Sequence, residues 1–278
     1  LNIAVQQFRA YGLENFTKPQ FQFSSDPDNL TNKGNDYSYG AGVRLGWLGN
    51  FAKNKVSLGA YYASRTYMSE FDDYRGLFAE QGDFDIPEHF GLGIAFHPTE
   101  KLTIAADVQQ IMYSDVLSVG NGHPTTSIND PCTRPITPCE NIPPGVTPQP
   151  TDEALGGDDG WGFGWDDATV YKLGAAYELN DNWILRAGWN YGESVISDDQ
   201  LLFNMLAPAV IEHHATLGLT YKLNRSSSID VSYVYGVENS QKCEVNKGCK
   251  TMLTQDPGAY VAAEMEIHAL GASFNYRF

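Results

Sequence analysis

The last fifteen residues, 264–278, alternate strictly between two kinds of side chain, and this pattern limits what the chain can fold into. One face carries His268, Leu270, Ala272, Phe274, Tyr276 and Phe278, and the other carries Ala269, Gly271, Ser273, Asn275 and Arg277. A period of two defines a β-strand with one apolar face and one small or polar face. A soluble domain rarely ends on such a strand. A closed membrane barrel can, because closure leaves no free edge and lipid covers the apolar face.

The same alternation recurs along the whole chain and predicts about ten strands. The nine others cover residues 1–8, 37–47, 56–65, 90–96, 102–109, 169–177, 183–191, 215–221 and 229–235. Their connections alternate between short turns, near residues 50, 99, 181 and 225, and long loops, which begin near residues 12, 69, 115, 194 and 239. Outer-membrane barrels have short periplasmic turns and long extracellular loops. We therefore predict an all-β fold, a transmembrane antiparallel β-barrel that forms one domain over residues 1–278 and ends at the periplasmic rim.

Composition agrees with a barrel and excludes some other classes. The 278 residues carry a formal net charge of −16, which argues against nucleic acid as a partner. No apolar run approaches the ~20 residues that a membrane helix needs, and barrel strands do not require one. The chain opens on Leu1, so we expect that an export signal has been removed. The first strand begins without a preceding turn, and we expect further strands to be missing before it. Residues 264–278 should then form an open edge or pair with residues 1–8.

Four cysteines form two close pairs in polar stretches between strands. They are Cys132 with Cys139 and Cys243 with Cys249. The surrounding sequence lacks the Cys/His spacing of a zinc site, so we expect neither a metal nor a cofactor. Two short disulfide-closed loops fit better and imply an oxidising compartment. A bridge between the two loops remains an alternative.

Several segments together carry a family resemblance. They include QFRAYGL (7–13), YGAGVRLGWLG (39–49), GLFAEQGDFDIP (76–87), DVQQIMYSD (107–115), VYKLG (170–174), WILRAGW (183–189) and LFNMLAP (202–208). In this order they resemble the FadL/OmpP1/TodX family of outer-membrane transporters for long-chain fatty acids and hydrocarbons. The resemblance implies a fourteen-strand barrel with an N-terminal hatch in its lumen, of which this chain would match the last ten strands. It also implies a monomer in the outer membrane of a Gram-negative bacterium.

Two long loops are unusually apolar, and they supply the candidate binding residues. In the loop 199–211, Leu201, Leu202, Met205 and Leu206 have the spacing of one side of a short helix. An apolar patch in an extracellular loop marks either ligand binding or packing against other loops, and both interpretations stay open. Burying an acyl chain contributes ~0.8 kcal/mol per CH₂. The predicted substrate-binding residues are Leu77, Phe78, Phe84, Leu201, Leu202, Phe203, Met205 and Leu206.

Charged side chains occupy positions that alternation assigns to the barrel lumen. The cations among them are Arg44, Arg65, Lys172 and Arg186. The carboxylate of a fatty acid would favour an arginine or lysine partner. For any single residue, however, we expect pairing with another barrel residue or with the hatch.

The combined prediction is passive, binding-guided diffusion of a long-chain fatty acid or another hydrophobic small molecule across the outer membrane. Membrane lipid and lipopolysaccharide would surround the barrel. The alternative is a barrel whose loops act as an adhesin or as a protease or phospholipase. Enzymatic activity is not expected, because there is no Gly-x-Ser-x-Gly motif and the adjacent His213 and His214 face opposite ways on a strand.

Overall fold

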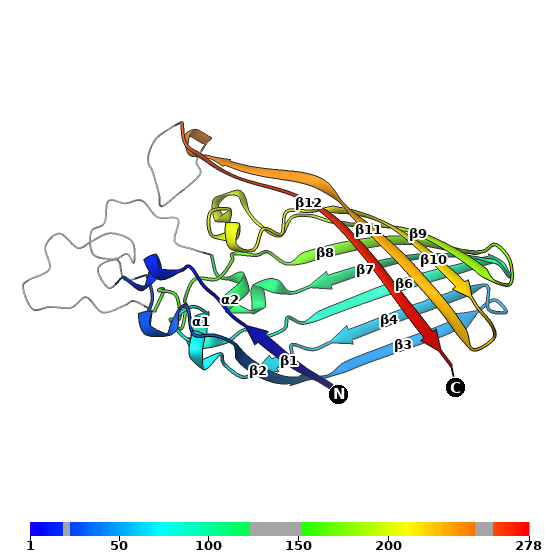
Figure 1. Cartoon of the computed structure of the whole chain (residues 1–278), viewed down its shortest axis with the longest axis horizontal. Coiled ribbons are helices and arrows are strands. Elements are labelled where there is room, and N and C mark those ends of the chain that lie inside the picture. Colours follow the sequence, from blue (N-terminus) through cyan, green and yellow to red (C-terminus); the bar gives the residue numbers. More distant parts are fainter. Residues whose placement is uncertain (19–22, 123–151, 248–257, 278) are drawn as a thin grey trace, which may run out of the picture.

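Long antiparallel strands form a strongly curved sheet, with tight turns at one end and the long loops at the other (Figure 1). The computed structural model describes residues 1–18, 23–122, 152–247 and 258–277. The order of the main sheet is β12-β11-β10-β9-β8-β7-β6-β4-β3. Its strands are β3 (Arg44–Phe51), β4 (Val56–Ala63), β6 (His89–Thr99), β7 (Leu102–Ile111), β8 (Ala168–Glu178), β9 (Trp183–Gly192), β10 (His213–Lys222), β11 (Ser227–Glu244) and β12 (Tyr260–Tyr276).

A second, smaller sheet has the order β1-β2-β5, and the helical turns lie in the connections between strands. Its strands are β1 (Asn2–Phe8), β2 (Asp36–Gly42) and β5 (Tyr67–Met68). The helical turns are α1 (Ala79–Gly82), α2 (Leu117–Gly120), η1 (Glu14–Thr17), η3 (Pro27–Asn29), η4 (Asp72–Tyr74), η5 (Tyr113–Asp115), η6 (Asp198–Gln200), η7 (Phe203–Leu206) and η8 (Val245–Lys247). None of the helices in the described ranges is long and apolar enough to cross a membrane.

The two sheets separate where two chain segments are interrupted. β2 and β3 form one run broken at Val43, and β4 and β5 form another broken at residues 64–66. Counting each broken run once gives ten strands among the described residues, in agreement with the number expected from alternation. A side chain at Gly42 would place its Cβ 2.7 Å from Thr66 Oγ1, so glycine is what lets β2 approach the following segment so closely.

A one-residue register shift accompanies this break. Arg44 pairs with Ala63 across β3 and β4, whereas Ala41 pairs with Tyr67 across β2 and β5. One additional residue therefore lies on the second segment, as in a β-bulge. Because side chains alternate, the shift turns Arg65 and Tyr67 to the face that carries Ala41. Alternation predicts a lumen position for Arg65, and the shift overturns that prediction.

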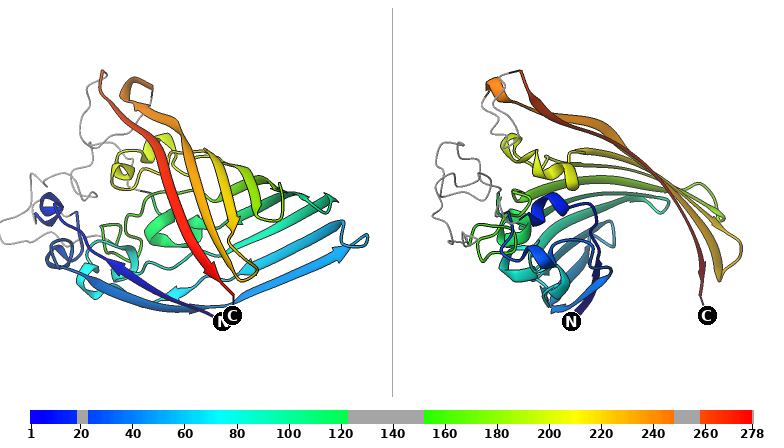
Figure 2. Two further views of the ribbon diagram at one scale, coloured as in Figure 1. Left: turned by 45° about the vertical axis from the view of Figure 1, so that its right-hand side comes forward. Right: turned by 60° about the vertical axis from the view of Figure 1, so that its left-hand side comes forward.

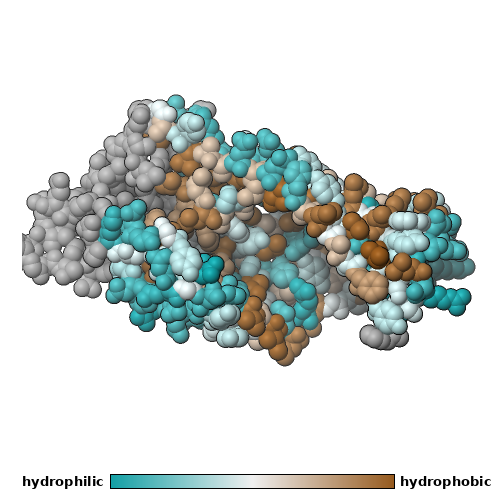
Figure 3. All heavy atoms as spheres, in the orientation of Figure 1, coloured by the Kyte–Doolittle hydropathy of each residue, from teal (hydrophilic) through white to brown (hydrophobic). Residues whose placement is uncertain are grey.

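The outward face of the sheet is apolar, as a lipid-facing wall requires. Hydrophobic residues gather over the strands at the right of Figure 3, while the coloured residues at its lower left, at the loop end, are largely hydrophilic. Leu92, Leu173 and Leu270 are all exposed on this face. Aromatic rings pack together near both ends of the strands: Trp183 and Tyr221 at the tight turns, tilted with 4.5 Å between centroids, and Tyr191 and His213 at the loop end, stacked at 4.7 Å. Aromatic girdles of this kind flank the apolar band of membrane barrels.

The sheet is open along one side (Figure 2). Among the described residues β12 pairs only with β11, and β1 pairs only with β2. Of the two outcomes expected for residues 264–278, the open edge is therefore the one observed. The free strands β12 and β1 lie at the two borders of the gap.

β11 and β12 extend further than alternation predicts. A loop is expected from residue 238 to 263, but β11 continues to Glu244 and β12 begins at Tyr260, with a register shift between Gly236 and Asn239. The prediction was wrong because the two faces show no contrast there: residues 238–244 of β11 are mostly polar on both faces, and residues 260–263 of β12, Tyr-Val-Ala-Ala, are apolar on both. Cys243, near the end of β11, is disulfide-bonded. Cys132, Cys139 and Cys249 lie outside the described residues, so the expected pairing stays a prediction.

Candidate ligand-binding site

The loops at one end of the sheet pack into a cap with its own hydrophobic core. The first buried cluster of this cap comprises Leu30, Phe71, Tyr74, Leu77, Phe78, Leu155 and Trp161, which come from three different loops. Phe8, at the end of β1, packs against it with its ring centroid 4.7 Å from that of Phe78 and 4.9 Å from that of Tyr74. Two predicted substrate-binding residues, Leu77 and Phe78, are thus core residues of the cap.

Polar contacts fix the loop 69–86 within this cap. The hydroxyl of Tyr74 donates to the carbonyl of Gly34 (2.7 Å) and accepts from the amide of Ala10 (3.1 Å), which ties together two loops. The amide of Phe71 donates to the carbonyl of Gly82 (2.8 Å), and Gly82 has a φ of +113°, which favours glycine. The loop therefore closes on itself while its apolar side chains enter the core.

The second apolar loop, between β9 and β10, forms two short 3₁₀ helices instead of one helical face. Leu201 is fully buried in a separate cluster with Val195, Ile196 and Val210. Met205 and Leu206, by contrast, are 52% and 56% exposed. The predicted common face is wrong because a 3₁₀ helix has three residues per turn, so positions four apart do not stack as they do in an α-helix.

Phe203 links this loop to the first cluster. Its ring centroid lies 5.6 Å from that of Phe163 and 6.3 Å from that of Trp161. Phe84 packs on Phe78 at 4.8 Å. The structure thus brings Leu77, Phe78, Phe84 and Phe203 together, places Leu201 in another cluster, and leaves Leu202 half-buried beside the exposed pair that follows it.

Asn204 is the buried polar centre of this loop, and sequence reasoning missed it. Its side-chain oxygen accepts from Trp165 Nε1 (2.6 Å). Its amide nitrogen donates to the carbonyls of Phe163 (2.5 Å) and Gln200 (2.9 Å). The bonds to Trp165 and Phe163 join the 193–212 loop to the 158–167 loop, and the bond to Gln200 lies within the 193–212 loop. The only signal in the sequence is a lone amide within an apolar run, LLFNML.

The inward face of the sheet is polar, and three of the four predicted lumen cations have partners there. Lys172 Nζ donates to Gln109 Oε1 (2.7 Å), and Arg186 Nη1 donates to Thr220 Oγ1 (2.6 Å). Arg44 Nη2 lies 3.0 Å from His89 Nε2. None of these three partners is a carboxylate. The guanidinium of Arg65 instead pairs with Asp83 and Asp85, as described below.

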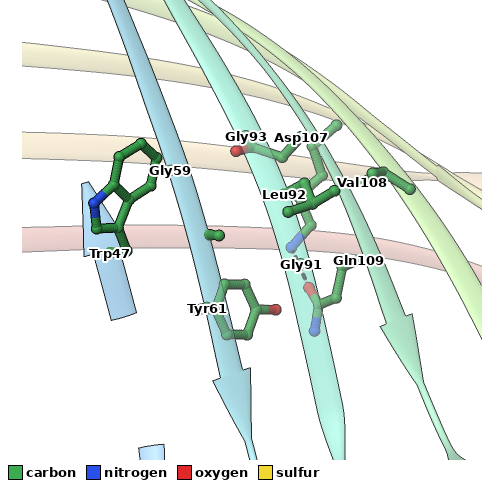
Figure 4. Close-up of a pocket in the computed structure, with 11 residues that line it drawn as sticks. Trp47, Gly59, Tyr61, Gly91, Leu92, Gly93, Asp107, Val108 and Gln109 are labelled. Atoms are coloured by element: carbon green, nitrogen blue, oxygen red, sulfur yellow. Dashed lines mark hydrogen bonds between the residues drawn. The ribbon is translucent and has the colours of Figure 1, made fainter. Parts of the chain in front are cut away.

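A cavity of about 440 Å³ opens along this inward face (Figure 4). Tyr61 from β4, Asp107 and Gln109 from β7 and Lys172 from β8 contribute its polar groups. A Cβ at Gly91, on β6 between them, would lie 2.6 Å from the ring of Tyr61. Glycine at this position therefore allows the ring to lie across β6. In the described part of the chain no group of three or more His, Cys, Asp or Glu side chains could hold a metal ion.

The family follows from a comparison of the sequence with known families. The family described as outer membrane protein transport protein (OMPP1/FadL/TodX) matches residues 79–278. The chain belongs to this family. Membership agrees with the lipid-facing girdles and the loop asymmetry of the sheet, and it confirms both the resemblance seen in the sequence and a place in the bacterial outer membrane.

Individual relatives of this FadL-family chain cover parts of it. The long-chain fatty acid transport protein of Escherichia coli O6:H1 is 31% identical over 118 residues, which are 41% of this chain and 24% of that protein. A Pseudomonas aeruginosa FadL homologue has a TM-score of 0.51 at 14% identity and covers 99% of this chain and 61% of its own. The P. putida toluene transporter TodX has a TM-score of 0.50 at 16% identity and covers 89% and 52%. The chain thus spans about half to three fifths of these structures, and they share its fold.

Proposed function

We propose that this protein transports hydrophobic small molecules across the outer membrane without enzymatic chemistry, and that long-chain fatty acids are among its substrates. The observation that carries the proposal is that one loop of the cap contains both buried and exposed apolar residues. Leu201 and Phe203 anchor the 193–212 loop in hydrophobic clusters, while Met205 and Leu206 of the same loop remain exposed. An apolar pair held rigidly in an extracellular loop is suited to capture an apolar ligand.

Physical chemistry supports passive, binding-guided diffusion. Burial of an acyl chain contributes ~0.8 kcal/mol for each CH₂ group, so a shallow apolar surface is sufficient for capture. Within the lumen, the ammonium group of Lys172 and the guanidinium groups of Arg44 and Arg186 form no ion pair among the described residues, and each can attract a carboxylate. The names of two relatives, a long-chain fatty acid transport protein and a toluene transporter, point to the same broad class of cargo.

A double substitution tests the capture surface. In cells that carry the full-length gene, Met205→Asp with Leu206→Asp is expected to lower the rate of labelled oleate uptake about tenfold, because two carboxylates replace the apolar contact. Both side chains are exposed, so the cap should still fold and the barrel should still insert. Uptake at a subsaturating oleate concentration is the measurement.

The matched control is Tyr11→Asp, since Tyr11 is also an exposed apolar side chain of a cap loop. Its uptake should equal that of the wild type. Equal uptake by the double variant and the wild type, at equal amounts in the outer membrane, would remove this surface from the transport route. Toluene uptake measured in the same cells shows whether a neutral hydrocarbon uses the same surface.

A further inference from the structure

The break between β4 and β5 is held together by an unusual cluster of charges. Arg65 is the additional residue at the register shift, and its Nε donates to Asp85 Oδ2 (2.6 Å). The other carboxylate oxygen, Asp85 Oδ1, accepts from the amide of Met68 in β5 (2.6 Å). The backbone amide of Met68 is thus satisfied by the side chain of Asp85, where a neighbouring strand would normally supply a carbonyl. Next to it, Thr66 and Ile86 form an isolated β-bridge. These contacts attach the loop 69–86 to β5 and to the segment before it, which are part of the barrel wall.

Asp83 shares the same arginine. Its Oδ2 lies 3.6 Å from Arg65 Nη2, and its side chain is hydrogen-bonded to that of Asp85. Its backbone is fixed on both sides: the amide donates to the carbonyl of Ala79 (3.1 Å), and its carbonyl accepts from Ser118 Oγ on α2. The carboxyl group therefore cannot turn far from Asp85 while the loop stays docked.

Negative charge dominates the surroundings of this pair. A surface cavity of about 760 Å³ lies beside it, and the ionisable side chains that line the cavity are Tyr37 and Tyr39 from β2, Arg65, Tyr67 from β5, and Glu70, Asp72, Glu80, Asp83 and Asp85 from the loop. One guanidinium therefore faces five carboxyl groups. Two carboxylates at hydrogen-bonding distance favour a state in which one of them keeps a proton.

The pKa of Asp83 is raised from 3.8 to about 7, first by burial and then by the charge of Asp85 and the hydrogen bond to it, and the nearby Arg65 offsets only part of this rise. The docked loop therefore holds a proton that a released loop would give up between about pH 4 and pH 7. Docking is strongest below this interval, weakens as the pH rises through it, and no longer changes above it. Asp83 lies in a loop, outside the membrane-spanning strands, so water can supply and accept the proton.

We propose that Asp83 is a proton-operated latch that holds the loop 69–86 against the wall while it is protonated and loosens the loop when it ionises. In the latched state the protonated carboxyl of Asp83 donates to Asp85, which keeps its bonds to Arg65 and Met68. After the proton leaves, two adjacent anions compete for one arginine and repel Glu80 as well. The same loop carries Leu77 and Phe78 into the core of the cap, so loosening at Asp83 also weakens the cap.

Hydrogen exchange of the purified protein in phospholipid nanodiscs tests the latch. The readout is the protection of the Met68 amide, whose acceptor is Asp85, after correction for the chemical effect of pH on exchange. Between pH 5 and pH 8 the protection in the wild type is expected to fall by roughly ten- to a hundredfold, less than the full pKa difference permits because solvent screens part of the repulsion. The amides of the loop 69–86 should follow the same titration.

Two variants assign the titrating group. Asp83→Asn keeps the hydrogen-bonding shape and stays neutral, so its Met68 protection should remain high and constant over the whole range. Glu70→Gln removes another carboxylate from the same cavity, one without a close contact to Asp85, and should titrate like the wild type. Constant protection in the wild type, or an unchanged titration in Asp83→Asn, would overturn the proposal.

Discussion

Replacing Phe78 with alanine is expected to destabilise the extracellular cap by about 3–5 kcal/mol, the usual cost of removing a buried phenylalanine. The ring is almost fully buried and contacts three other aromatic rings, those of Phe8, Phe71 and Phe84, at centroid distances of 4.7, 5.8 and 4.8 Å. Its loss leaves a cavity among rings from β1 and the loop 69–86. Amide exchange of residues 71–79 should accelerate strongly in the absence of any ligand, while exchange in the barrel strands stays unchanged.

A lipid-facing phenylalanine provides the control for this experiment. Phe90, at the start of β6, is 43% exposed on the outward face, and Phe90→Ala should leave exchange in the cap unaltered. The experiment distinguishes a core residue of the cap from a residue that lines a ligand groove. A residue that only lines a ligand groove would lose ligand affinity upon substitution without faster exchange in the empty protein, and that result would show that Phe78 is not a core residue.

The strands could be predicted from the sequence because lipid and lumen impose opposite demands on alternate residues. This holds for β8 and β9, whose observed bounds differ by at most one residue from the predicted segments 169–177 and 183–191. The prediction fails where alternate residues show no contrast, as in residues 238–244 of β11, which are mostly polar, and residues 260–263 of β12, which are apolar. The prediction also fails at Arg65. One additional residue in the strand reverses the face of every later side chain, and the pattern of apolar residues does not reveal it.

The cap residues were identifiable as a group but not by their roles. Apolar side chains in a loop have the same composition whether they bury one another or await a ligand. Leu201 and Leu206 are identical residues in one short run, yet one is fully buried and the other exposed. Contacts with other loops decide between the two roles, and these contacts join residues as far apart in sequence as Phe8 and Phe78.

Asn204 shows why exposed and buried side chains can alternate so abruptly in this loop. Its hydrogen bonds to Trp165 and Phe163 hold η7 against the 158–167 loop, so Phe203 packs toward Trp161 while Met205 and Leu206 remain exposed. Gln241, on the extended part of β11, adds a second support: its Nε2 donates to the carbonyl of Ile196 (2.7 Å) and to Asp198 Oδ1 (2.9 Å). The exposed apolar pair is therefore presented by a braced loop, which lowers the entropic cost of binding a ligand.

Replacing Asn204 with alanine is accordingly expected to release the loop 193–212. The change removes the hydrogen bonds to the indole Nε1 of Trp165 and to the carbonyls of Phe163 and Gln200, and a buried polar group that loses its hydrogen bond costs about 1–3 kcal/mol. Exchange of amides 198–206 should rise by two or more orders of magnitude, and oleate uptake should fall with it because Met205 and Leu206 lose their fixed orientation.

The matched control for this change is Asn224→Ala, in the tight turn between β10 and β11, where the side-chain oxygen accepts from the exposed amide of Ser226 (2.8 Å). Water can replace that bond, so stability and uptake should stay close to wild-type values. The pair of variants separates two explanations of transport. If Asn204→Ala loosens the loop but uptake is unchanged, the capture of substrate does not depend on a rigid cap, and the lumen alone determines the rate. If protection of the loop amides and oleate uptake both fall, the side chain of Asn204 is what holds Met205 and Leu206 in the orientation that binds the ligand.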